Sequence, residues 1–278
     1  MSDKIIKGLL FLMCAVSISC GGNSAADGNT ADAAAQKQRD SLALKVGVSQ
    51  RLDCLPAFYA ESEGLFDSLG VSVKLVNYTS LLDCDVSLRR RTIDGAFTDE
   101  KRVAYLKSHD NVRLSKSFST DMQWQLVASH SSRVQRVSQL ADKMVAMTRF
   151  SATDYFCDLM TDSMKSRSKV FYRIQVNDVD LRLKMLLNKE IDAAWLPEPQ
   201  ASVAIRSGGN VIMKSGRQGK DLSGLYFLEA LNADGRKAQQ IKTFVKAYDE
   251  AKAKIAAMNK KQYSELVNRY YKYNNVEK

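Results

Sequence analysis

The strongest constraint on the fold is an alternation of short apolar runs and longer amphipathic segments, which begins near residue 42 and continues to the C-terminus. Such alternation is typical of βαβ units and therefore of an α/β fold with mainly parallel sheets. The expected strands cover residues 42–48, 71–78, 93–97, 112–119, 124–130, 144–147, 169–176, 191–195, 210–214 and 225–231. The expected helices cover residues 57–66, 81–91, 99–108, 137–143, 152–164, 180–188, 236–258 and 260–271.

One local pattern occurs twice in the chain, 98 residues apart. The first copy is LRRRTIDGAF at 88–97 and the second is LLNKEIDAAW at 186–195. Each copy has the sequence of a helix end, a polar turn and a short buried strand whose small residues let a helix pack closely. Two similar α/β lobes would produce this repeat. The alternative is a coincidence between two common helix-to-strand turns.

The first nineteen residues have the layout of a secretory signal. Lys4 and Lys7 form a basic start, the apolar run GLLFLMCAVSI follows, and the small Ser19 precedes Cys20. The run is shorter than the roughly 20 residues that a membrane-spanning helix needs, and the alternative is a short buried helix. Residues 20–41 are mostly small and polar, so we expect a flexible tether there.

The stretch SISC at 17–20 resembles the lipobox of bacterial lipoproteins. The resemblance implies a diacylglyceryl thioether on Cys20 after cleavage, and hence a lipid anchor in a membrane. The sequence departs from the pattern at Ser17, where leucine is usual. No acidic run follows Cys20 of the kind that some surface-exposed lipoproteins carry. We therefore expect the protein in the cell envelope, anchored by lipid and facing the periplasm.

The formal net charge is +10, which raises nucleic acid or an anionic lipid surface as partners. An exported protein does not meet nucleic acid, so we expect no nucleic-acid partner. The lysines are densest in the last two expected helices, where a solvated helix face explains them.

Three stretches resemble the periplasmic solute-binding proteins of the NMT1/THI5-like superfamily, in the order that this family has them. They are VGVSQ and the segment up to KLV at 46–76, VSQLADKMVAM with SATDYF at 137–156, and IDAAWLPEP at 191–199. The resemblance runs from about residue 42 to the C-terminus. Members of the superfamily serve ABC importers for nitrate, sulfonates, taurine and thiamine pyrimidine precursors.

The resemblance implies the type II periplasmic-binding fold, in which two α/β lobes joined by a two-strand hinge close on a ligand. On that template, lobe one is 42–124 plus 223–278 and lobe two is 125–222. It also implies a monomer that captures a small organic ligand and delivers it to ABC permease and ATPase subunits. Two alternatives stay open: an enzyme of the same fold that makes pyrimidine or menaquinone precursors, and an envelope lipoprotein with a non-transport interaction role.

Ligands of open α/β sheets bind outside the carboxyl ends of the strands, and one such end is unusually stiff. Pro197 and Pro199 come just past the expected strand 191–195, where fixed φ angles and missing donors end the strand. They would present Trp195 and Glu198 to a cleft. The alternative is a helix start at these prolines, with Trp195 in the core.

The other strand-end loops differ between the lobes. In lobe two, hydroxyls, a guanidinium and a helix N-terminus suit an anion, although ordinary capping explains them equally. In lobe one, carboxylates suit an amine or cation, although turn aspartates are common. This difference favours a zwitterionic or amino-bearing ligand. The candidate residues are Gln50, Arg51, Asp53, Asp83, Asp99 and Trp124 in lobe one, and Thr148, Arg149, Ser151 and Thr153 in lobe two.

The remaining question is whether the cysteines and histidines form a disulfide, a metal site or a catalytic site. Cys54 and Cys84 follow strands that should be adjacent, so in an oxidising compartment they either form a disulfide or remain two free thiols, whereas Cys157 has the position of a buried hydrophobe. His109 and His130 lie away from the cysteines, so neither a metal site nor a Cys/His nucleophile has a supporting spacing. No Gly-rich phosphate loop occurs. We therefore expect no cofactor, no metal and no enzymatic activity.

The lipobox gives a testable prediction. Cys20→Ala should leave an uncleaved or soluble chain and abolish metabolic labelling with a fatty acid, because the thioether needs the Cys20 sulfur. Cys14→Ala provides the control, since bulky Met13 precedes Cys14 and makes it a poor acceptor. Unchanged labelling of Cys20→Ala would refute the lipobox assignment.

Overall fold

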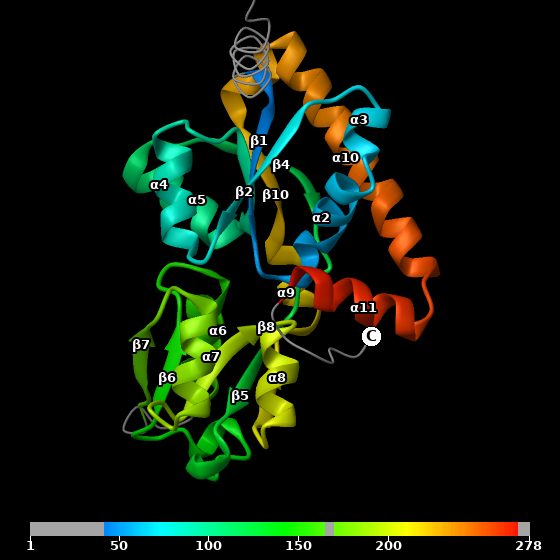
Figure 1. The fold of residues 1–278 in the computed structure, drawn as a ribbon. Helices are drawn as coiled ribbons and strands as arrows, with labels where there is room; N and C mark the ends of the chain where they lie inside the picture. Colours follow the sequence, from blue (N-terminus) through cyan, green and yellow to red (C-terminus); the bar gives the residue numbers. More distant parts are fainter. Residues whose placement is uncertain (1–41, 165–169, 272–278) are drawn as a thin grey trace, which may run out of the picture. The chain divides into compact units, whose positions relative to one another are not determined.

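The computed structural model describes residues 42–164 and 170–271. The expected signal at 1–19, Cys20 and the tether at 20–41 lie outside the described residues. The described chain contains two five-stranded sheets (Figure 1), each of which forms the centre of one lobe. Within these residues, no helix combines the length and the apolar character needed to cross a membrane.

The sheet of lobe one has the strand order β2-β1-β3-β10-β4. Strand β1 pairs in parallel with β2 and β3, whereas β10 pairs antiparallel with β3 and β4. The strands are β1 (Leu44–Ser49), β2 (Val73–Tyr78), β3 (Gly95–Asp99), β4 (Leu114–Ser119) and β10 (Ser223–Leu228).

The sheet of lobe two has the equivalent order β7-β6-β8-β5-β9. Strand β6 pairs in parallel with β7 and β8, and β5 pairs antiparallel with β8 and β9. The strands are β5 (Trp124–Ala128), β6 (Met144–Met147), β7 (Tyr172–Gln175), β8 (Ala193–Pro197) and β9 (Asn210–Lys214).

In each sheet, the single antiparallel strand is the first one that the chain forms after it crosses from the other lobe. The chain crosses between β4 and β5 and returns between β9 and β10 through the short helix α9 (Gly216–Leu222). The predicted fold class, two α/β lobes with mainly parallel sheets, is therefore confirmed, while one of the two connections expected as hinge strands contains α9.

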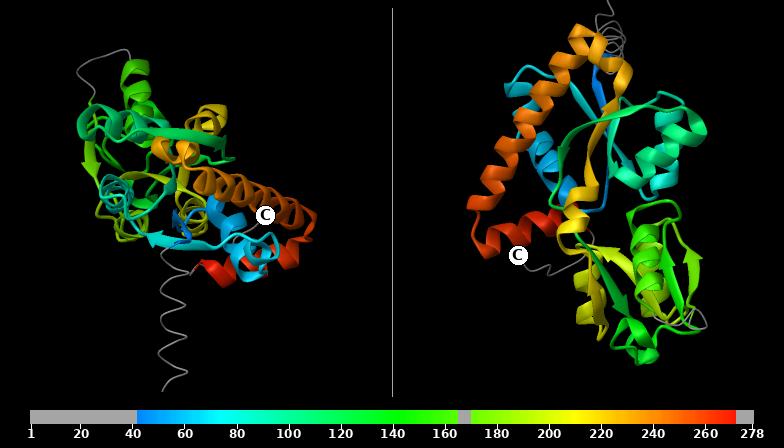
Figure 2. Two further views of the ribbon diagram at one scale, coloured as in Figure 1. Left: turned by 90° about the horizontal axis from the view of Figure 1, so that it is seen from above. Right: turned by 180° about the vertical axis from the view of Figure 1, so that it is seen from behind.

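Helices cover both faces of the lobe-one sheet (Figures 1 and 2). Helices α2, α3 and α10 pack on one face around Phe66 and Phe244, and α4 and α5 pack on the other around Leu88 and Leu106. The final helix α11 contacts α2. Their bounds are α2 (Leu55–Ser62), α3 (Leu65–Ser68), α4 (Leu81–Arg89), α5 (Glu100–Asp110), α10 (Gly235–Ala257) and α11 (Lys260–Tyr270).

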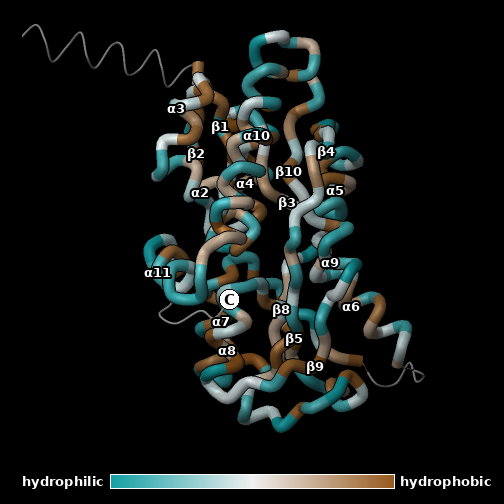
Figure 3. Tube along the Cα trace, turned by 90° about the vertical axis from the view of Figure 1, so that its right-hand side faces the viewer, coloured by the Kyte–Doolittle hydropathy of each residue, from teal (hydrophilic) through white to brown (hydrophobic). Residues whose placement is uncertain are grey.

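Lobe two follows the same plan, with hydrophobic residues concentrated along β5 and β8 (Figure 3). Phe156 and Trp195 lie in the core on one side of its sheet, and Leu183 and Leu186 lie in the core on the other. The helices are α6 (Ala152–Ser163), α7 (Val179–Leu187) and α8 (Gln200–Arg206).

The sequence repeat is a structural repeat. Asp94 precedes β3 and Asp192 precedes β8, and each carboxylate caps the strand beside it. Asp94 Oδ2 accepts the Lys45 N–H at 2.8 Å, and Asp192 Oδ2 accepts the Met144 N–H at 2.9 Å. The two aspartates also donate their own N–H groups to Lys45 O at 2.8 Å and Met144 O at 3.1 Å. The same side chain thus performs the same capping role in both lobes.

Three local expectations need correction. Strand β8 extends through Pro197 instead of ending at residue 195, because Pro197 is the last residue that pairs with β5. Only a 3-10 turn, Val137–Gln139, forms within the expected helix 137–143. Helix α9 was not expected, because its residues GRQGKDL show no apolar periodicity.

Candidate ligand-binding site

A pocket lies between the two lobes, at the carboxyl ends of the central strands. The space between the protein atoms there amounts to about 690 Å³, a value that includes open solvent. Lobe one contributes Gly47, Val48, Ser49, Gln50, Arg51, Tyr78, Thr79, Ser80, Leu81, Cys84, Phe97 and Asp99. Trp124, Thr148, Ser151, Thr153, Asn177, Val179, Asp180, Arg182, Pro197 and Gln200 complete the lining.

Arg51 follows β1 and is held by a carboxylate of its own loop. Its Nε and Nη2 donate to Asp53 at 3.1 and 2.9 Å, and Thr120 Oγ1 donates to the same carboxylate at 3.0 Å. Burial acts to lower the pKa of Arg51, but the attraction of Asp53 outweighs it and the pKa is raised. The guanidinium is therefore charged and oriented before any ligand arrives.

The C-terminal helices fix the backbone of this loop. Tyr271 Oη donates to Arg51 O at 2.7 Å, and Tyr248 Oη donates to Asp53 O at 2.8 Å. Both tyrosine side chains are buried. The loop that presents Arg51 is thus held by residues about two hundred positions later in the chain.

Asp99 ends β3 and connects the lobes. Its Oδ1 accepts the Arg102 N–H at 3.0 Å, which caps α5 in lobe one. The same oxygen accepts the Ala152 N–H at 3.0 Å, at the start of α6 in lobe two. Oδ2 is buried and makes no hydrogen bond within the described chain. Burial raises the pKa of Asp99, although these backbone donors oppose the shift.

Arg182 of α7 is the second buried guanidinium of the pocket, and it was not among the residues predicted from the sequence. Its side chain is 1% exposed. It donates to Val176 O at 3.0 Å from Nε, to Trp195 O at 2.6 Å and to Thr148 Oγ1 at 2.6 Å. All of these partners are neutral, and burial lowers the pKa of Arg182 to about 10.

A cation that is buried without a carboxylate partner is costly, so Arg182 marks a place where an anionic group would be stabilised. A sequence signal for it exists. Arg182 occupies the apolar face of α7 together with the buried Leu183 and Leu186. A charged residue on the buried face of a short helix is uncommon unless it has a specific partner.

Gln200 makes a further contact between the lobes. Its fully buried Nε2 donates to Gln50 O of lobe one at 2.9 Å and to Asp180 Oδ1 of lobe two at 2.9 Å. Its Oε1 has no hydrogen-bond partner among the described residues. Nearby, the Leu52 N–H donates to Glu198 O at 3.1 Å. The two lobes therefore contact each other directly at this side of the pocket.

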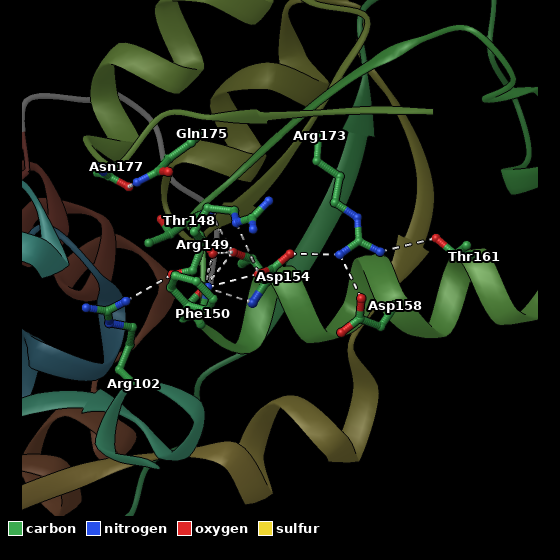
Figure 4. Close-up of polar contacts among 12 residues, drawn as sticks. Arg102, Thr148, Arg149, Phe150, Asp154, Asp158, Thr161, Arg173, Gln175 and Asn177 are labelled. Carbon is green, nitrogen blue, oxygen red and sulfur yellow. Dashed lines mark hydrogen bonds and ion pairs between the residues drawn. The ribbon is translucent and has the colours of Figure 1, made fainter. Parts of the chain in front are cut away.

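A second group of contacts, the outer contact, joins the lobes through residues that do not line the pocket. Arg102 pairs with the buried Asp85, and its Nη1 donates to Arg149 O at 3.0 Å (Figure 4). Phe150 stacks on Tyr105 of the other lobe, with ring centroids 4.6 Å apart. Phe150 has a φ of 55°, a left-handed conformation that is rare for an aromatic residue.

The structure brings together seven of the residues that the sequence singled out. The pocket lining includes Gln50, Arg51, Asp99, Trp124, Thr148, Ser151 and Thr153.

Five others lie outside the pocket lining. Asp53 lies behind Arg51, and Asp83 is exposed on α4. The Arg149 side chain is about half exposed, with Nε 3.9 Å from Asp154 Oδ2. Glu198 accepts from Gln125 Nε2 at 2.6 Å and from the Ser202 N–H at 3.1 Å.

Trp195 is the fifth, and it is part of the core. It has no exposed surface, and its ring lies 5.0 Å from that of Phe156 between centroids. Alternate residues of a strand face opposite sides of the sheet, and Trp195 faces the side that α6 covers. Trp195 is therefore a core residue, which was the alternative to a ligand contact.

The N-terminus of α6 is capped from within the protein. Ser151 Oγ accepts the Thr153 N–H at 3.1 Å, Thr153 Oγ1 accepts the Thr148 N–H at 3.0 Å, and Asp99 takes the Ala152 N–H. Asp154 of the same helix forms ion pairs with Arg173, at 2.9 Å, and accepts the Phe150 N–H (Figure 4). Ser151 and Thr153 therefore cap the helix, which was the alternative to anion binding. Both residues also line the pocket.

Of the two alternatives for Cys54 and Cys84, the structure has the free thiols and no disulfide between them. Cys54, Cys84 and Cys157 are all buried free thiols, and burial raises the pKa of Cys54 and of Cys157 to about 12. Thiols with such pKa values are poor nucleophiles and poor metal ligands. Within residues 42–164 and 170–271, no three His, Cys, Asp or Glu side chains are grouped so that they could hold a metal ion.

No family model matches the sequence, and no curated protein is significantly similar to it. Solved structures are similar in fold. The zinc-bound ligand-binding component of an ABC-type import system from Staphylococcus aureus is 14% identical, with a TM-score of 0.69 over 84% of this chain and 80% of that chain. The periplasmic nitrate-binding protein NrtA from Synechocystis PCC 6803 is 15% identical, with a TM-score of 0.70 over 82% of this chain and 66% of that chain.

A third similar structure is the alkanesulfonate-binding protein SsuA from Xanthomonas axonopodis pv. citri, bound to MOPS. It is 12% identical, with a TM-score of 0.62, and the match covers 84% of each chain. These similarities establish that the protein has the two-lobe fold of periplasmic binding proteins.

The buried carboxyl at the outer contact gives a testable prediction. Burial outweighs the attraction of Arg102 and raises the pKa of Asp85 from 3.8 to about 6. The folded chain then holds this proton more tightly than the unfolded chain. The resulting stabilisation is complete below about pH 4 and is lost as the pH rises through about 6. Asp85→Asn, which cannot titrate, should flatten this fall in the free energy of unfolding by up to about 3 kcal/mol.

Urea unfolding between pH 4 and pH 7 measures this difference. The matched control is Asp83→Asn on the same helix, because Asp83 is exposed. Equal pH profiles for wild type and Asp85→Asn would contradict the assignment.

Proposed function

We propose that the protein is the solute-binding component of an ABC importer and captures a small organic ligand between its lobes. The main support for this proposal is the inter-lobe pocket. Side chains from both lobes meet there at the strand ends, and two guanidiniums are buried. A pocket made from both lobes changes when the lobes move apart, which suits a protein that must bind a solute and then release it.

The similar structures support this proposal. By their names, they are the ligand-binding component of an import system, a nitrate-binding protein and an alkanesulfonate-binding protein. All three names describe binding and none describes catalysis. The buried, unreactive thiols of the described chain agree with a binding role.

Arg182 is proposed to hold an anionic group of the ligand. It already donates to three neutral acceptors, and an acid would supply the negative charge that its surroundings lack. Arg149 was the sequence-based candidate for this role, but its side chain extends away towards Asp154. Charge-assisted hydrogen bonds to a buried guanidinium contribute about 1.5 to 3 kcal/mol.

The remaining features of the proposal rest on the N-terminal sequence and on the family resemblance. A lipid on Cys20 would tether a monomeric receptor in the cell envelope on the periplasmic side. Its protein partners would be the permease and ATPase subunits of the importer. The net charge of +10 needs no nucleic-acid partner in that location.

Thermal melting of the purified protein against sulfonates, nitrate, pyrimidines, amino acids and flavins tests the proposal. A ligand with a Kd of about 1 μM, present at about 1 mM, stabilises the folded state by about 4 kcal/mol. For a chain of this size, that corresponds to a shift in Tm of the order of 10 °C. Titration calorimetry on the best compound then gives Kd.

Two arginine variants locate the anion site. Arg182→Lys keeps the charge but loses the planar fork, so Kd for an acidic ligand should rise about ten- to hundredfold. Arg149→Lys, the matched exposed control, should change Kd by less than about twofold. No stabilisation by any compound would contradict solute capture, whereas loss of affinity in Arg149→Lys alone would place the anion at Arg149, outside the pocket lining.

A further inference from the structure

The N-terminus of α6 would be the natural place for an oxyanion in this pocket. Helix N-termini carry partial positive charge and unpaired N–H donors, and α6 has twelve residues. In this protein, however, the carboxylate of Asp99 from the opposite lobe occupies that position. Asp99 Oδ1 lies 3.0 Å from Ala152 N and 3.0 Å from Arg102 N, so one oxygen serves the first turns of both α5 and α6. The negative charge that this helix end can stabilise is already present.

The other charges around the pocket do not favour a ligand of net negative charge. Arg51 and Arg182 are the cations of the lining, and Asp99 and Asp180 are the anions. Arg51 is further neutralised by Asp53 at 2.9 Å. Two guanidiniums therefore meet three carboxylates, so a ligand that adds only negative charge would increase the excess.

The free oxygen of Asp99 indicates what the ligand carries instead. Asp99 has no exposed surface, and Oδ2 has no hydrogen-bond partner in the described parts of the chain. A carboxylate with an unpaired buried oxygen is destabilising unless a donor reaches it. A ligand that lies in the pocket could supply that donor, with its acid at Arg182 on the opposite lobe.

We infer that Asp99 is a specificity-determining residue, which makes the pocket select a ligand with an amine or similar donor next to its acid and reject bare oxyanions. The inference rests on the proposed function and names the ligand class of the same site. Arg182 recognises the acid and Asp99 Oδ2 recognises the donor. Because Asp99 also bonds to Ala152 of the other lobe, the same side chain senses the ligand and holds the lobes together.

Pairs of probes that differ only in the amine test the inference. In taurine and 1-propanesulfonate, or β-alanine and butyrate, an ammonium group replaces a methyl group of similar size. Each α-amino acid can likewise be compared with its deaminated acid. For the wild type, Kd should be about ten- to hundredfold lower for the amino-bearing member of at least one pair.

Asp99→Asn reverses the hydrogen-bonding character of the free atom. Its carbonyl oxygen can still accept the Ala152 and Arg102 N–H groups, while the exchanged group becomes a donor without charge. The preference for the amine should fall to within about threefold, and the amine-free acid should bind more tightly than it binds to the wild type. Asp234→Asn is the matched control, because Asp234 caps α10 away from the pocket. It should keep the wild-type preference.

Calorimetry distinguishes the outcomes. Equal affinity of the wild type for both members of every pair would overturn the inference while leaving solute capture intact. Binding of bare acids alone, or of no probe in any pair, would overturn the ligand class, and the wider thermal-shift panel would then decide on the proposed function. The wild-type comparison stands even if Asp99→Asn fails to fold.

Discussion

The inter-lobe pocket depends on one carboxylate that is shared between two helix N-termini. Asp99 ends β3 in lobe one, and its Oδ1 accepts N–H groups from the first turns of α5 and α6. Without this contact, two sets of unpaired helix donors and two like dipole ends would face each other across the pocket. The carboxylate converts that repulsion into an attraction. Around it, Arg102 with Asp85 on one side and Gln200 on the other extend the contact between the lobes.

Each lobe contributes to the pocket one charged side chain whose interactions are incomplete among the described residues. In lobe one, Arg51 has its own carboxylate and a backbone held by Tyr248 and Tyr271. There, Asp99 Oδ2 has no hydrogen-bond partner among the described residues. In lobe two, Arg182 is buried among neutral acceptors, and no carboxylate of the described residues pairs with it. A ligand with an acid and a donor would supply both partners.

Local patterns predicted much of the fold. The alternation of apolar runs located the strands, because a strand between two helices is apolar over its whole length. The repeat around Asp94 and Asp192 predicted two similar lobes. Each copy is one continuous stretch of ten residues, so it can be recognised without knowledge of the fold. Arg51, Asp99 and Ser151 lie at or just after the carboxyl ends of strands. That position alone was enough to predict that they lie beside the pocket.

Predictions that needed the third dimension were less successful. Arg182 went unnoticed because nothing in α7 shows that its buried face meets the pocket. Trp195 was a candidate ligand contact, yet the face of β8 on which it lies belongs to the core. The capped state of α6 could not be predicted at all, because its cap comes from residue 99, more than fifty positions earlier.

A crystal structure of the protein with its tightest-binding small molecule tests the central claim most directly. The account predicts the molecule between the lobes, with an acid oxygen about 2.7–3.1 Å from a nitrogen of Arg182 and a donor at a similar distance from Asp99 Oδ2. A saturating ligand that binds elsewhere on the surface, or that lies in the pocket with neither contact, would contradict it.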